Sequence, residues 1–114
     1  MPVVPLTVVE TPQFLRQARD LWTDAERQEF VGFIARNPET GDLIPDTGGV
    51  RKIRWRRQGM GKRGGARVIY FYHNPTTPLF LLMVYAKAVR DDLTAEAKQA
   101  VTEFAARIKR AGRG

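Results

Sequence analysis

The chain has 114 residues, and its 19 Lys and Arg against 12 Asp and Glu give a net charge of +7. This length suits a single domain over residues 1–114. The absence of cysteine excludes a disulfide scaffold, a thiol nucleophile and a cysteine zinc site, and a single histidine, His73, excludes a multi-histidine metal site. We therefore expect neither a metal nor another cofactor.

No segment predicts a membrane anchor or a signal peptide. The longest apolar run, between Pro78 and Lys87, is about half of the roughly twenty residues that a membrane-spanning helix needs. The N-terminal segment Met1–Glu10 lacks the basic start of a signal peptide. We expect a cytoplasmic protein with no membrane partner.

The first third of the chain predicts one strand and two helices. The valine-rich segment Val3–Glu10 is typical of a strand. Thr11 is a suitable N-cap for a helix whose apolar residues follow at helical spacing as far as Trp22. Thr23 to Glu26 matches a capping box, which predicts a second helix that ends at Asn37.

The rest of the chain predicts three strands and a last helix. Residues 38–49 form a loop, and Val50–Arg56 and Arg67–Tyr72 form the two strands of a hairpin. Leu79–Lys87 is strongly apolar and predicts a central strand, while Thr94 caps a final helix with one apolar stripe. This order favours an α+β fold with a mostly antiparallel sheet of about four strands and helices on one face.

Basic residues are concentrated in the segment 51–67, which contains eight of them and no acid. They are Arg51, Lys52, Arg54, Arg56, Arg57, Lys62, Arg63 and Arg67. Alternation along the first hairpin strand puts Lys52 and Arg54 on the face opposite Ile53 and Trp55. Such a segment indicates an anionic partner on an open sheet face, although a solvated surface is the alternative.

Several other features have a structural and a functional interpretation. Gly59, Gly61 and Gly64 match the dinucleotide pattern, but a strand follows them, so we expect a hairpin loop. The rings of Tyr72 and Tyr85 are candidates for stacking on RNA bases. We expect Trp55 in the core, His73 in a turn, and Asp91-Asp92 as acids that favour the start of the last helix.

Four segments carry a resemblance to a known family: Gly48–Trp55, Gly61–Tyr70, Tyr85–Lys87 and Asp91–Thr94. In these segments the sequence resembles the RelE/ParE superfamily of bacterial toxins, and most of all its HigB-like branch. The resemblance spans nearly the whole chain and implies the same fold. It also implies the toxin of a type II toxin–antitoxin pair, a ribosome-dependent mRNA endoribonuclease that cleaves without a metal by attack of the 2′-hydroxyl.

The resemblance assigns roles to individual residues. By position, Lys52 and Arg54 match the basic pair of the active-site face, Arg67 the arginine at the scissile phosphate, and Lys87 a lysine of the C-terminal segment. Thr94 stands where RelE has a tyrosine, so the general base is open among Lys52, Tyr85 and Tyr72. The remaining residues that we expect to contact RNA are Arg51, Arg56, Arg57, Lys62, Arg63 and Arg90.

The resemblance also implies partners, namely the ribosomal A site with its mRNA and a cognate antitoxin, usually one with a helix-turn-helix domain. Two other functions fit the same features. The chain is alternatively a ParE-like inhibitor of gyrase, or an RNA-binding module without catalytic activity.

Overall fold

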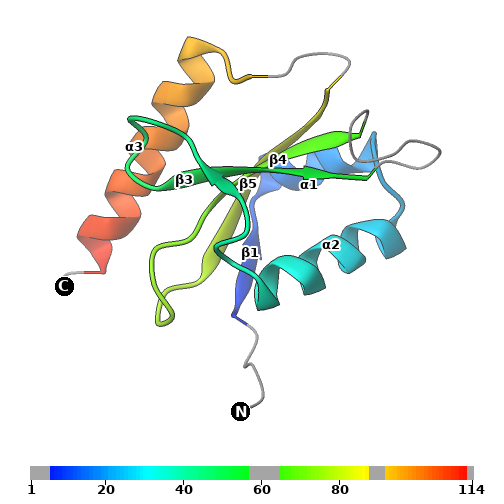
Figure 1. The fold of residues 1–114 in the computed structure, drawn as a ribbon, viewed down its shortest axis with the longest axis horizontal. Helices are drawn as coiled ribbons and strands as arrows, with labels where there is room; N and C mark the ends of the chain where they lie inside the picture. The colour runs from blue at the N-terminus through cyan, green and yellow to red at the C-terminus, as the bar shows by residue number, and fades with distance from the viewer. Residues whose placement is uncertain (1–5, 57–64, 88–91, 113–114) are drawn as a thin grey trace.

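The computed structural model describes residues 6–56, 65–87 and 92–112 (Figure 1). The elements in chain order are β1 (Val8–Glu10), α1 (Pro12–Arg19), α2 (Asp24–Arg36), β2 (Asp42–Leu43), β3 (Val50–Trp55), β4 (Ala66–Phe71), β5 (Leu79–Ala86) and α3 (Ala95–Ala111). The fold is α+β, as the order of predicted elements indicates.

The strands form one sheet in the order β1-β5-β4-β3-β2, and it is mostly antiparallel. β1 runs parallel to β5, while β2, β3, β4 and β5 pair antiparallel in turn. The hairpin of β3 and β4 is confirmed. β2 is a fifth strand inside the predicted loop 38–49, and its two residues are too short to show any alternation.

Helices cover both faces of this sheet, so the prediction of helices on one face is wrong (Figure 1). On one face, Phe14 of α1 and Phe30 of α2 belong to the core cluster that contains Val68 of β4. On the other, Val101 and Ala105 of α3 belong to the cluster that contains Val50, Ile69 and Phe71. Both faces are covered because all six residues of β4 are buried, so each face of this strand needs an apolar cover.

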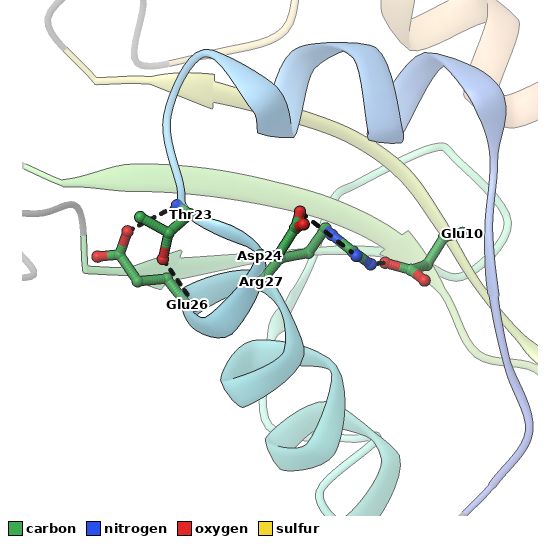
Figure 2. A network of polar contacts seen from close by, with 5 residues as sticks. All are labelled: Glu10, Thr23, Asp24, Glu26 and Arg27. Carbon is green, nitrogen blue, oxygen red and sulfur yellow. Dashed lines mark hydrogen bonds and ion pairs between the residues drawn. The ribbon is translucent and has the colours of Figure 1, made fainter.

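The predicted caps are confirmed. Thr23 accepts a hydrogen bond from the Glu26 backbone at 3.1 Å, and the Glu26 carboxylate accepts one from the Thr23 backbone at 2.8 Å (Figure 2). Figure 2 also shows Arg27 of α2 between Glu10 and Asp24, where its ion pair with Glu10 joins the helix to β1. Local sequence thus fixes the start of the helix, and a long-range ion pair fixes its place.

Tyr70 on β4 holds the loop that precedes β2. The Gly41 backbone N–H donates to the Tyr70 hydroxyl at 2.8 Å, and that hydroxyl donates to the Pro38 carbonyl at 2.9 Å. Arg51 donates from Nη1 to the carbonyl oxygens of Glu39 at 3.0 Å and Gly41 at 2.7 Å. Position 41 requires glycine, because a Cβ there would lie 2.8 Å from the Tyr70 ring.

Tyr70→Phe should lower the free energy of unfolding by about 1–3 kcal/mol, since the Gly41 N–H and the Pro38 carbonyl lose their partner. Urea unfolding of wild type and variant measures this difference. Tyr72→Phe is the matched control, because no hydrogen bond of the Tyr72 hydroxyl is present among the described residues. Equal effects of the two substitutions would contradict the account of this loop.

The Tyr70 hydroxyl also makes the stability of the protein depend on pH under alkaline conditions. Burial raises the pKa of Tyr70 above its ordinary value, so the folded state favours the protonated phenol. That contribution is complete below about pH 10, the pKa of an unfolded tyrosine, and is lost as the pH rises above it. The stability advantage of wild type over Tyr70→Phe should therefore shrink above about pH 10.

Candidate functional site

Three of the predicted catalytic residues form one row across the sheet. Arg54 on β3 lies opposite Arg67 on β4, and Arg67 lies opposite Tyr85 on β5. Directly opposed residues of antiparallel strands project from the same face. The sheet register thus brings Arg54, Arg67 and Tyr85 together on one face of the sheet. α3 packs on the same face, toward Val50 and Phe71. Lys52 lies two residues before Arg54 and projects from the same side of β3.

The two arginines of the row are close neighbours. The Ile44 backbone N–H donates to the Val50 carbonyl at 2.9 Å, so Val50, and by alternation Lys52 and Arg54, turn their backbone groups toward β2. Arg54 and Arg67 are therefore a non-hydrogen-bonded pair, whose Cα atoms lie about 4.5 Å apart in such ladders. Two like charges placed in this way repel each other, and an anion bound between them would offset that repulsion.

These arginines differ in exposure. Arg54 is exposed, and its side chain has no hydrogen bond or ion pair within the described part of the chain. Arg67 is only 1% exposed, and its Nη1 donates to the Ala66 carbonyl at 3.4 Å. Arg67 thus shares the face of Arg54 but is buried there. A guanidinium keeps its charge when buried, so Arg67 adds positive potential beneath the surface that Arg54 presents.

Lys52 forms an ion pair with Asp92, an acid that we expected only to favour the start of the last helix. Its Nζ lies 3.0 Å from Oδ1 of Asp92, a residue that precedes α3. The cap of α3 is Thr94, whose hydroxyl accepts from the Ala97 backbone at 3.1 Å, as predicted. No local pattern links two residues 40 positions apart, so this ion pair was not visible in the sequence. The Lys52 ammonium is thus engaged by a carboxylate from another part of the chain.

The other predicted residues divide into three groups. Lys87 is exposed and follows Tyr85 by two positions, at the end of β5. Arg56 is exposed but pairs with Glu29 of α2 at 2.7 Å, and its guanidinium lies 5.8 Å from the centre of the Trp55 ring. Four more lie outside the described residues, namely Arg57, Lys62, Arg63 and Arg90.

Two predicted RNA contacts lie away from the row. Arg51 points to the opposite face from Lys52, where its guanidinium is bound to backbone carbonyls. Tyr72 is half-buried against the cluster under α1 and α2, beyond the far end of β4 from Arg67. Tyr85 is 9% exposed, so neither tyrosine is the freely exposed ring that was considered for stacking.

A groove of about 560 Å³ lies beside the row, at the free edge of β3. Its walls are residues 40–42 on one side and residues 52–55 on the other, and Phe33 of α2 also lines it. Within the described residues no three His, Asp or Glu side chains gather in a way that would hold a metal ion. The described helices include none with the length and apolar character needed to cross a membrane.

The chain is similar to known proteins in sequence and in fold. Residues 7–113 match the family model described as the RelE toxin of the RelE/RelB toxin–antitoxin system. The chain belongs to the RelE toxin family. Among solved structures, the E. coli toxin RelE in the free state, a double arginine-to-alanine mutant, is similar with a TM-score of 0.54 and 15% identity. That alignment covers 76% of this chain and 88% of that toxin, and it shows the shared fold.

The family makes this RelE-type chain a toxin with an antitoxin partner, and it supports a ribonuclease activity in broad terms. The resemblance found in the sequence is thereby confirmed at the level of the RelE family. The dinucleotide alternative receives no support, because β4, the element that follows the glycine pattern, is a strand.

Asp92→Asn should make RNA binding by this RelE-type toxin more salt-dependent, because it frees the Lys52 ammonium to contact a phosphate. One added phosphate contact steepens the slope of log K against log salt by about 0.7 for single strands. Fluorescence anisotropy with a single-stranded RNA over a salt series measures the slope. Asp20→Asn, at the end of α1, is the matched control. An unchanged slope for Asp92→Asn would contradict the account of Lys52.

Proposed function

We propose that this RelE-type toxin is a ribosome-dependent endoribonuclease that cleaves mRNA and so stops translation. The observation that carries the proposal is the cross-strand row, which combines an exposed arginine, a buried arginine and a tyrosine on one face. Cleavage of RNA needs positive charge at the phosphate and groups that move two protons. The row contains the charge and one such group, Tyr85, and a second, Lys87, follows at the end of β5.

The reaction that suits these residues needs no metal. The 2′-hydroxyl of one nucleotide loses its proton and attacks the adjacent phosphorus, while the bond from phosphorus to the 5′-oxygen breaks. The products are a 2′,3′-cyclic phosphate and a 5′-hydroxyl, which takes up a proton. Arg54 neutralises the charge that develops on the non-bridging oxygens, and Arg67 adds to the field from below.

We assign the proton transfers to Tyr85 and Lys87. Lys52 is engaged by Asp92, and Tyr72 lies toward the opposite face, which leaves Tyr85 among the three candidate bases. Tyr85 lies directly opposite Arg67 in the row, on the strand that ends beside Lys87. Lys87, exposed at the end of the same strand, is placed to protonate the leaving 5′-oxygen.

The proposal extends to the partners and the location of the protein. The segments Gly48–Trp55 and Gly61–Tyr70 support a place in the HigB-like branch, and with it an antitoxin that carries a helix-turn-helix domain. The substrate is mRNA in the ribosomal A site, in the cytoplasm. The net charge of +7 favours association with ribosomal RNA.

Arg54→Ala should lower cleavage by about two orders of magnitude or more, because it removes the exposed charge at the phosphate. Primer extension on an mRNA in a reconstituted translation reaction measures the cut sites and their rates. Arg36→Ala, an exposed arginine at the end of α2, is the control and should cleave like wild type. Arg54 is preferable to Arg67 as a test, since removal of the buried Arg67 also threatens the fold.

Cleavage that appears with wild type only when ribosomes translate the message would support the proposal. A message that stays intact in a translating reaction with correctly folded wild-type protein would contradict it. Inhibition of purified gyrase in its supercoiling assay would then favour the ParE-like alternative.

A further inference from the structure

The last residues of β5 have a neighbouring strand on one side only. β1 pairs with β5 no farther than Leu81, and in the described part of the chain no other strand lies along this edge. On the opposite side, β4 pairs with β5 as far as Ala86. Tyr85 therefore belongs to a stretch of β5 whose outer edge has no strand beside it.

A bulge separates this stretch from the start of β5. Two neighbouring residues of β4 pair with Leu81 and Met83, which leaves Leu82 between them without a partner on β4. A bulge of this kind interrupts the ladder and bends the strand that contains it. The pairing of β1 with the start of β5 therefore does not by itself fix the position of the residues beyond Leu82.

A side chain of α1 binds the outer edge of β5 beyond the bulge. The Lys87 backbone N–H donates to the Gly65 carbonyl at 3.1 Å, toward β4. By alternation, Tyr85 also turns its backbone groups toward β4, and Val84 turns its own away. The Val84 N–H donates to Oε1 of Gln17 at 3.0 Å. Because Val84 is buried, loss of this acceptor would leave a buried N–H unpaired.

This hydrogen bond lies one residue from the side chain that we assign to proton transfer. Val84 directly precedes Tyr85, and the backbone that Gln17 holds is the backbone from which the Tyr85 ring projects. The ring is buried in the cluster under α3, so a shift of the strand would move it as a unit. A displacement of about 1 Å at a reacting group can lower a rate by about 100-fold.

Thr11 binds the same strand at the other end of the bulge. Its hydroxyl lies 2.8 Å from the Leu81 carbonyl oxygen and 3.4 Å from that of Leu82, and donates to them. It also caps α1 by accepting from the Phe14 N–H at 3.3 Å. Thr11 therefore contributes hydrogen bonds to β5 as Gln17 does, but three residues or more before Tyr85.

We propose that Gln17 is a positioning residue for RNA cleavage, which holds the end of β5 and thereby places Tyr85 beside Arg67. The proposal rests on the proposed ribonuclease function and adds to it a residue outside the row. Gln17 acts through a backbone N–H of β5, and the chemistry stays with the row itself.

Gln17→Met tests the proposal, because methionine keeps the length of the side chain and lacks the amide oxygen. Primer extension on translating ribosomes should show a rate of cleavage about tenfold lower than that of wild type. Gln17→Glu keeps an oxygen acceptor for the Val84 N–H and should restore most of the rate. Thr11→Val is the matched control, which should be destabilised in urea unfolding but cleave like wild type.

A double-mutant cycle with Tyr85→Phe separates positioning from a general loss of structure. If Gln17 acts through the Tyr85 hydroxyl, Gln17→Met should cause little further loss of cleavage once that hydroxyl is absent. A general loss of structure would lower the rate by the same factor in both backgrounds. Gln17→Asn, whose side chain is one methylene shorter, replaces Gln17→Met in this cycle if the methionine variant does not fold.

Several results would overturn the role of Gln17 and leave the ribonuclease function standing. They are a wild-type rate in Gln17→Met, an equal loss in both backgrounds of the cycle, and no rescue by Gln17→Glu. A loss in Thr11→Val as large as that in Gln17→Met would overturn it as well. So would wild-type cleavage by Tyr85→Phe, since no hydroxyl would then need a position. Absence of cleavage by wild type would contradict the proposed function together with this role.

Discussion

The burial of β4 on both faces is the constraint on which the rest of this structure depends. Its apolar side chains alternate between the two faces, so the sheet needs a helical layer on each side. The layer formed by α3 covers the end of one face near Val50 and Phe71. The other end of that face is where Arg54, Arg67 and Tyr85 line up, so the packing of the core decides where the polar row lies.

The basic residues of the segment 51–67 differ in how the folded chain engages them. The basic segment 51–67 contains no acid, but the fold brings acids to it from elsewhere in the chain. Asp92 pairs with Lys52 and Glu29 pairs with Arg56, while backbone carbonyls hold Arg51. In the described part of this segment, Arg54 is the cation that is exposed and has no side-chain partner. Of the basic cluster seen in the sequence, the described part of the fold therefore leaves the side chain of Arg54 exposed and available to an anion.

Local chemistry explains what the sequence predicted well. A cap such as Thr23 acts within one turn of helix, and the alternation of Ile53 with Arg54 acts within one strand, so both were predicted correctly. The side of the sheet that α3 covers depends on the whole core, and the Lys52–Asp92 pair depends on the loop before that helix. Neither leaves a local pattern, and the sequence analysis missed both.

The central claim is that the row of Arg54, Arg67 and Tyr85 supports attack by the 2′-hydroxyl of the RNA. The most direct measurement uses two ribosome-bound messages that differ by a single 2′-deoxy substitution at the cleaved nucleotide. The account predicts that the all-ribose message is cut to a 2′,3′-cyclic phosphate and a 5′-hydroxyl, and that the substituted message stays intact at that position. Cleavage of the substituted message at the same bond, or 5′-phosphate ends on the products, would contradict it.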